Sequence, residues 1–258
     1  MTVKRSVRAI GVNPRTVIDS VKGLSKFRAN RQEFSRQANG RTAWEIGNDW
    51  PCLADRYDQS GVANGQYFHQ DLYVAQQIFQ QRPEQHLDAG SRVDGFVAHV
   101  ATFMPIEVLD IRPLTTSATN ITFSQRDLMK PDPTFDNCTD SLSCLHTLEH
   151  FGLGRYGDTI DYDGYLRGWS SLSNMVRPGG RFYFSVPISQ RQRIEFDAHR
   201  LFGVPHLLEM IDPIFDIVRI AVVDDSGELR EDLKIRSAEA SRTFDIEYGC
   251  IIFVLLKR

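Results

Sequence analysis

The chain has 258 residues, of which 41% are hydrophobic and 24% charged, and its formal net charge at pH 7 is −3. This composition excludes a disordered chain and is sufficient for one sizeable hydrophobic core. The four cysteines have no CxxC spacing, which favours neither a zinc knuckle nor a disulfide framework. No stretch approaches the roughly 18 apolar residues that span a bilayer, and no secretory signal core is evident. We therefore expect a soluble, cytoplasmic protein.

Residues 1–41 form a basic arm. The arm holds ten lysine and arginine residues against two acidic ones, a net charge of +8, whereas the following 20 basic and 31 acidic residues give −11. Asn13-Pro14 is a typical helix start, and apolar side chains then recur on one face: Val17, Ile18, Val21 and Leu24. We expect an amphipathic helix that packs against the acidic domain or against a second subunit. Alternatively, the helix binds a membrane surface, a polyanion or an anionic substrate, or the segment is a transit peptide.

The rest of the chain alternates between strand-like and helix-like segments. Residues 42–68 are rich in turn formers and predict a connector, and helical periodicity returns at Asp71. On that helix, one face is formed by Leu72, Ala75, Ile78 and Phe79. Strands are predicted at 86–89, 106–111, 121–124, 140–145 and 182–186, helices at 95–103 and 164–176, and a closing antiparallel hairpin from 214–223 and 250–256. This order predicts a doubly wound, mostly parallel seven-stranded α/β sheet in a domain of residues 46–258, after a helical extension of residues 1–45.

The spacing of Gly90 and Asp110 indicates a nucleotide site. Each residue follows a short apolar run that reads as a buried strand, and twenty residues separate them. In doubly wound sheets, the first strand ends in a tight glycine turn under the ligand, and the second ends in a carboxylate that accepts hydrogen bonds from ribose hydroxyls. Dinucleotide sites require G-x-G-x-x-G, but Arg92 occupies the second glycine position here. NAD and FAD are therefore disfavoured.

The pattern fits S-adenosylmethionine better. An acid two residues before the first glycine, here Asp88, is typical of such sites, where it lies near the cofactor's ammonium group. An acid at the end of the second strand, an acid after the third and a Pro-Gly-Gly before the fifth complete the class I methyltransferase pattern. Those positions hold Asp110, Asp127 and Pro178-Gly179-Gly180.

The match extends beyond this superfamily pattern to one family. The segments that carry it are 67–71, 88–95, 110–114, 140–158, 183–187 and 193–200. Over residues 50–255 the chain resembles an uncharacterised family first named from nematode proteins of unknown function, whose bacterial members occur among surface-polysaccharide genes. The resemblance implies the class I, Rossmann-like methyltransferase fold, S-adenosylmethionine as cofactor and a sugar or sugar-linked acceptor.

On this analogy, the cofactor positions have separable roles. Gly90 would let the backbone approach the cofactor, and Arg92 would bind its methionine carboxylate through a bidentate contact. Asp110 would accept from the ribose, and Asp127 would accept from the adenine amino group while Leu128 flanks the ring. Structural roles compete at these positions: Asp88 could cap its turn, Asp127 could cap a short helix and Arg92 could pair with Asp94.

The acceptor site should follow the fourth strand, where His146 and His150 stand four residues apart. Methyl transfer to a hydroxyl requires a base, for which histidine has a suitable pKa. We place His146 first, since it follows the strand directly, then His150, with His199 as a third candidate. A divalent metal also suits this spacing, but no third ligand is evident, and we expect no metal.

Two loops could contact the acceptor. The glycine-rich segment 151–158 offers Arg155, Tyr156 and Asp158, and Arg200 follows the fifth strand beside His199. Alternatively, these side chains do not contact the acceptor but pair with one another and fix the loops. We therefore expect a methyltransferase that modifies an oxygen or nitrogen of a saccharide-related small molecule, without nucleic acid or membrane partners. A non-catalytic binding or scaffold protein with a degenerate fold is the alternative.

Overall fold

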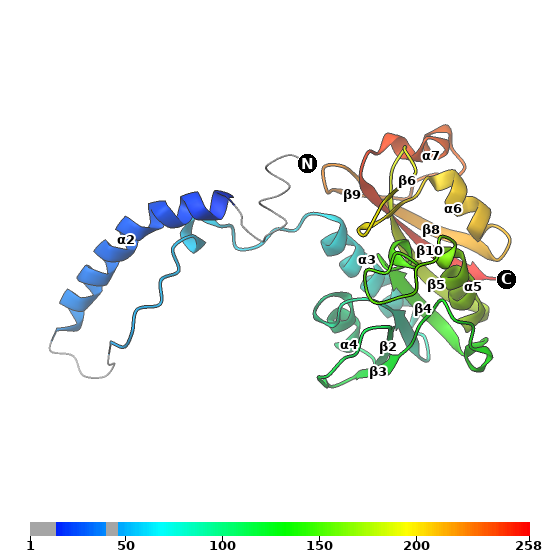
Figure 1. Ribbon diagram of the computed structural model, residues 1–258, viewed down its shortest axis with the longest axis horizontal. Coiled ribbons are helices and arrows are strands. Elements are labelled where there is room, and N and C mark those ends of the chain that lie inside the picture. The colour runs from blue at the N-terminus through cyan, green and yellow to red at the C-terminus, as the bar shows by residue number, and fades with distance from the viewer. Residues whose placement is uncertain (1–13, 40–45) are drawn as a thin grey trace. The chain divides into compact units, whose positions relative to one another are not determined.

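The computed structural model of the chain describes residues 14–39 and 46–258, which fall into two compact units, Met1–Val62 and Ala63–Arg258. The expected cap at Asn13 lies outside the described residues. In the first unit, helix α2 spans Pro14–Ala38, and a short 3-10 helix, η1, spans Asp55–Tyr57 (Figure 1). Gly23 is buried, and a Cβ there would lie only 2.0 Å from the Leu53 carbonyl oxygen, so no larger residue fits at this position.

The predicted apolar stripe of α2 is solvent-exposed. Its side chains retain between 37% and 71% of their accessible surface: Val17, Ile18, Val21 and Leu24. Arg31 donates to Asp49 at 2.6 Å and thereby ties the helix to the segment that returns beside it within the same unit. No described helix is long and apolar enough to cross a bilayer.

The second unit is built on an eight-stranded sheet of order β3-β2-β1-β4-β5-β10-β8-β9. Its strands are β1 (His86–Ala89), β2 (Ile106–Asp110), β3 (Ile121–Gln125), β4 (Thr139–Leu145), β5 (Val176–Ile188), β8 (Phe215–Val223), β9 (Leu229–Glu231) and β10 (Gly249–Lys257). β1 to β5 are parallel to one another, whereas β10 is antiparallel to both β5 and β8. The doubly wound sheet with an antiparallel edge is confirmed, and β9 is a three-residue strand added to the seven that the sequence predicts.

Helices cover both faces of the sheet (Figure 1). The longer ones are α3 (Gln66–Gln81), α5 (Gly164–Met175) and α6 (Val204–Ile211); α4 (Ala98–Ala101) and α7 (Ala238–Ser241) have one turn. Three more 3-10 turns, η3, η4 and η5, span Pro133–Phe135, Leu148–His150 and Thr243–Asp245. A separate hairpin pairs β6 (Arg193–Glu195) with β7 (His199–Leu201), and the sequence analysis did not predict it.

Two helix predictions need correction. α3 begins at Gln66, five residues before the predicted start, and its core-facing side chains are Tyr73, Val74, Ala75 and Ile78. Leu72 and Phe79, placed on that face by the sequence analysis, remain 38% and 49% exposed. The helix expected at 95–103 is broken near its start, because Gly95, inside η2 (Val93–Val97), has non-helical dihedral angles, and only α4 follows it.

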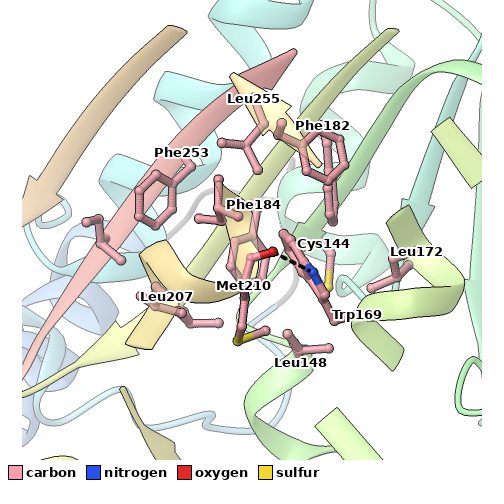
Figure 2. Packing of buried hydrophobic residues seen from close by; sticks show 14 of the residues in the cluster. Cys144, Leu148, Trp169, Leu172, Phe182, Phe184, Leu207, Met210, Phe253 and Leu255 are labelled. Atoms are coloured by element: carbon pink, nitrogen blue, oxygen red, sulfur yellow. Dashed lines mark hydrogen bonds between the residues drawn. The ribbon is translucent and has the colours of Figure 1, made fainter. Parts of the chain in front are cut away.

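Alternation along the central strands divides the core into two apolar clusters. On β5, Phe182 and Phe184 point to one side of the sheet and Tyr183 to the other. Figure 2 shows the first side, where Trp169 of α5 stacks on Phe182 with ring centroids 5.6 Å apart. The indole N–H of Trp169 donates to the Met210 carbonyl at 3.2 Å, so the one polar atom of this ring is satisfied. This packing holds the carboxyl ends of β1, β2 and β4 together at one edge.

Candidate functional site

A cavity of about 720 Å³ opens at the carboxyl ends of β1, β2 and β4. Parallel strands of an open α/β sheet bind ligands at this edge, and the volume is that of a small-molecule site. Its lining includes these predicted site residues: Gly90, Arg92, Asp110, Asp127, Leu128, His146, His150, Arg155, Tyr156 and Asp158. Asp88, His199 and Arg200 are not part of the lining.

The turn after β1 depends on a glycine. Gly90 has φ +76°, and a Cβ there would lie 2.4 Å from the Thr147 methyl carbon in the turn after β4. Any other residue would be strained at this φ and would push the two turns apart. Gly90 therefore keeps the floor of the cavity open between β1 and β4.

Asp88 lies under this turn and is fully buried. Its oxygens accept from the Ser91 amide at 3.0 Å, the Ser91 hydroxyl at 2.8 Å and the Ser143 hydroxyl at 2.5 Å. Burial raises the pKa of Asp88 to about 6, even though these hydrogen bonds favour the carboxylate. Next to it, burial lowers the pKa of His86 to about 3, and this neutral ring bridges the Ser141 and Ser143 hydroxyls.

Replacing Asp88 with asparagine should change how stability depends on pH. Because the folded-state pKa of Asp88 lies above its ordinary value of 3.8, its contribution to stability is complete below pH 4 and is lost as the pH rises toward 6. The free energy of unfolding of D88N relative to wild type should therefore rise across pH 4 to 6, by roughly 3 kcal/mol at most. Urea titrations at several pH values measure this difference. The pH-dependent contribution of His86 to stability cancels, because wild type and D88N both contain this residue. Parallel stability curves would contradict it.

Asp110 at the end of β2 is held by Arg112. One carboxylate oxygen accepts from the Arg112 amide at 2.8 Å and from Nε at 3.1 Å, and the other accepts from Nη2 at 2.6 Å. The guanidinium also lies 4.5 Å from the ring centroid of Tyr156, in the loop that follows η4. Arg92 pairs with Asp94 at 2.7 Å on the surface of the cavity mouth, as the structural alternative for this residue anticipated.

Asp127 and the two residues after it form the opposite wall. Asp127 accepts from the Met129 amide at 3.1 Å and lies 3.2 Å from the Lys130 ammonium. The side chains of Leu128 and Met129 are buried at the cavity lining. A carboxylate beside two apolar side chains suits a flat heterocycle that carries an amino group.

A buried carboxylate, Glu149, joins the histidines after β4. His146 Nδ1 lies 3.0 Å from Glu149 Oε1, and His150 Nε2 lies 3.8 Å from the same oxygen. His146 has φ +49°, and its Nε2 is buried without a hydrogen-bond partner among the described residues. Burial alone would lower the pKa of His146, but the adjacent Cys250 sulfur and the Glu149 carboxylate outweigh it and hold that pKa well above 6.5.

His150 is in a different electrostatic state. Its Nδ1 lies 2.7 Å from the Ala198 carbonyl oxygen, so Nδ1 carries the proton and Nε2 carries the lone pair. Burial lowers the pKa of His150 below its ordinary value. Its ring meets Tyr156 edge to face at 5.3 Å and lies 6.5 Å from the ring of His199, which borders Tyr248 outside the cavity lining.

The glycine-rich loop is shaped by Asp158. This carboxylate accepts from the Gly152, Gly154 and Tyr156 amides at 2.8, 3.1 and 3.2 Å. Arg155 donates to the Ala198 carbonyl at 3.0 Å, which links the loop to the β6–β7 hairpin. Asp158 thus fixes the loop from within, while Arg155 and Tyr156 present their side chains to the cavity.

Arg200 is buried and forms its hydrogen bonds with backbone carbonyls. Its guanidinium donates to the carbonyls of Glu149, Phe151 and Tyr162 at 3.3, 2.6 and 3.0 Å. Burial lowers the pKa of Arg200, although the guanidinium stays charged. Arg200 was predicted to lie near the crevice, but its inward direction has no signal in the sequence.

Other cavity residues had no role assigned from sequence: Tyr67, Gln70, Asp71, Arg112 and Thr147. Asp71 could have been noticed as the only acidic residue on an otherwise uncharged helix, α3. The described residues include no cluster of three or more histidine, cysteine, aspartate or glutamate side chains arranged for a metal.

Known structures share this architecture. The N-methyltransferase NodS from Bradyrhizobium japonicum WM9, in complex with S-adenosyl-L-homocysteine, matches with a TM-score of 0.51 and 12% identity, over 88% of this chain and 97% of that one. A 1,6-didemethyltoxoflavin-N1-methyltransferase from Burkholderia thailandensis, with 1,6-didemethyltoxoflavin and S-adenosylhomocysteine bound, matches with a TM-score of 0.48 and 15% identity. The match covers 92% of this chain and 91% of that one. No curated protein matches the chain in sequence.

A family model covers more than half of the chain. The model, described as a Caenorhabditis protein of unknown function, DUF268, matches residues 114–257. The matched part includes η4, the glycine-rich loop and every strand from β3 to β10. The chain therefore belongs to the DUF268 family, and its fold is the Rossmann-like fold of class I methyltransferases.

Proposed function

We propose that this protein is an S-adenosylmethionine-dependent methyltransferase. The observation that carries the proposal is the cavity itself, which has a glycine turn at β1, a carboxylate at the end of β2 and an Asp-Leu-Met wall beyond β3. These features supply a close backbone approach, a ribose acceptor and an adenine pocket, in the order that a class I site requires. The NodS structure with bound S-adenosylhomocysteine has the same fold.

The residues present fit this cofactor. The Gly90 turn leaves space that a Cβ would fill, and Asp127 offers a carboxylate oxygen beside apolar side chains. Asp110 accepts three hydrogen bonds from Arg112, and a carboxylate has about four acceptor positions. Two ribose hydroxyls would therefore displace at least one of the Arg112 contacts, which is feasible because Arg112 is partly exposed.

Within this proposal, His150 is the base. When bound, S-adenosylmethionine would supply an electrophilic methyl group, whose bond to sulfur would break to leave S-adenosylhomocysteine. His150 Nε2 takes the proton from the acceptor hydroxyl or amine as that atom gains the methyl group, and Nδ1 keeps its proton on Ala198. Glu149, 3.8 Å from Nε2, stabilises the positive charge that develops on the ring. This order differs from the sequence-based preference for His146, which lines the same cavity. The lowered pKa of His150 and the hydrogen bond of its Nδ1 to Ala198, which leaves the lone pair on Nε2, support it.

The acceptor in this proposal is a saccharide-related small molecule, in keeping with a role in surface polysaccharide biosynthesis. Arg155 and Tyr156 line the acceptor side beside His150 and offer a charged donor and an aromatic face to a polar ligand. A substrate with hydroxyl groups and an anionic substituent would use both.

A thermal-shift panel tests the cofactor. S-adenosylhomocysteine should raise the melting temperature, whereas NAD and ADP should not, because a ligand at 100 times its dissociation constant stabilises the fold by about 2.7 kcal/mol. Stabilisation by NAD alone would contradict the proposal. Binding of S-adenosylhomocysteine without methyl transfer to any acceptor would favour the scaffold alternative.

For the basic arm, we propose packing against the acidic domain or a second subunit. Deleting residues 1–41 should then lower the melting temperature or the assembly mass, since the surface that the exposed apolar stripe of α2 covers would lose its partner. Differential scanning fluorimetry and light scattering of the full chain and the deletion measure both. Liposome binding at physiological salt that is lost on deletion would contradict the packing proposal.

A further inference from the structure

The site needs a carboxylate for the cofactor's ammonium group, and Asp88 is poorly placed for this contact. Its side chain is fully buried beneath the turn, outside the cavity lining. Both of its oxygens are engaged by Ser91 and Ser143. Asp88 therefore shapes the turn from below, and a ligand in the cavity would meet a different acid.

Asp71 is that acid by position. It projects from the second turn of α3 into the cavity lining, on the side of the glycine turn. A Cβ built on Gly95 would lie 3.2 Å from Asp71 Oδ2, so the carboxylate stands directly against the Gly90–Gly95 segment. In open α/β sheets, the ligand lies in the crevice beyond the carboxyl ends of the strands, next to this segment.

The Asp71 carboxylate is oriented by a hydrogen bond, and it forms no ion pair with the described residues. The Gln70 amide donates to its Oδ1 at 3.0 Å, and Gln70 is itself buried and accepts from the Ser185 hydroxyl. Among the described residues, no lysine, arginine or histidine nitrogen lies within ion-pair distance of Asp71. Burial raises the pKa of Asp71, and this effect outweighs the lowering by the Gln70 hydrogen bond and by the charges of His99 and His146.

Other acids at the cavity already have cationic partners. Asp94 pairs with Arg92, Asp110 with Arg112 and Asp127 with Lys130. Asp158 is occupied by three loop amides. Asp71 is thus the cavity carboxylate whose charge a ligand would balance.

We infer that Asp71 binds the ammonium group of the amino-acid part of the ligand in this cavity. The inference rests on the proposed function, since it assigns a partner to one group of S-adenosylmethionine. Arg92, across the same turn, is placed to take the ligand's carboxylate. The zwitterion would then be held between one acid from α3 and one arginine from the turn after β1.

Calorimetry with two ligands tests this assignment on the full chain. S-adenosylhomocysteine carries the amino-acid group, and 5′-methylthioadenosine has the same adenosine but lacks that group. Asp71→Asn should weaken binding of S-adenosylhomocysteine about tenfold to a hundredfold, the range for a charge-assisted contact, and leave 5′-methylthioadenosine within about twofold. Asp71→Ser, which also keeps a short polar side chain, should repeat the result and serves if the first variant is unstable.

Asp136→Asn is the matched control. It removes the same charge from an exposed residue before β4, at the opposite end of the sheet, and should change neither affinity. Equal losses for both ligands, or no loss for either, with D71N would overturn the role of Asp71 while leaving the proposed cofactor intact. If the wild-type chain binds neither ligand, the proposed function itself fails, and the inference fails with it.

Discussion

Replacing Asp110 with alanine should weaken binding of S-adenosylhomocysteine by about a hundredfold or more. Each hydrogen bond from a ribose hydroxyl to a carboxylate contributes about 1.5 to 3 kcal/mol, and the variant loses two of them. Unlike the loss in D71N, this loss should also appear with 5′-methylthioadenosine, because both ligands contain the ribose. Isothermal titration calorimetry of wild type and D110A measures both affinities.

The interpretation of this variant depends on Arg112, which loses its carboxylate partner in D110A. Arg112→Met is therefore the matched control, since it removes the ion pair but keeps the carboxylate. If the ribose contact dominates, R112M should retain most of the affinity that D110A loses. Equal binding by wild type and D110A would show that the end of β2 does not hold the ligand.

Local patterns predicted the strands that build the cavity because their signals lie within a few residues. The β1 strand coincides with the predicted 86–89, since a four-residue buried run ends at a glycine with positive φ. Asp110 stands at the end of β2 for the same reason. The sequence alone could thus place Gly90 and Asp110 at one edge of the sheet, because the carboxyl ends of neighbouring parallel strands lie at the same edge.

Side-chain direction was harder to predict because it depends on distant segments. Arg200 was expected to face the crevice, but its guanidinium reaches the carbonyls of η4 and of the segment before α5. Leu72 and Phe79 were placed on the buried face of α3 from spacing alone, whereas packing against the sheet selects Tyr73, Val74 and Ile78. The tertiary contacts that decide these directions have no signature in a short window of sequence.

Glu149 was seen as an ionisable residue after the fourth strand, but it was given no role, for a related reason. In sequence it is one more polar residue between His146 and His150, and nothing marks it as buried. In the fold it is 1% exposed and lies within 4 Å of both imidazoles. Glu149 raises the pKa of both histidines. At His146 the Cys250 sulfur and Glu149 together outweigh burial, whereas burial prevails at His150.

That difference yields the largest expected effect on catalysis. His150→Ala should lower turnover by roughly 10² to 10⁴, the usual contribution of a general base, with little change in affinity for S-adenosylhomocysteine. Turnover is measured as the formation of S-adenosylhomocysteine from S-adenosylmethionine in the presence of saccharide or nucleotide-sugar acceptors. His206→Ala is the control, since His206 lies on α6, outside the cavity lining, and contacts the Tyr165 hydroxyl at 3.2 Å.

The pH profile of the wild-type enzyme distinguishes the two candidate bases without any substitution. With His150 as base, turnover should be level at pH 7 and fall only below about 6.5, because burial keeps the pKa of His150 under its ordinary value. With His146 as base, the fall in turnover should come at a higher pH, because the Cys250 sulfur and the Glu149 carboxylate hold the pKa of His146 well above 6.5 despite burial. A rate that continues to climb from pH 7 to 9, together with full activity in H150A, would assign the proton transfer to His146.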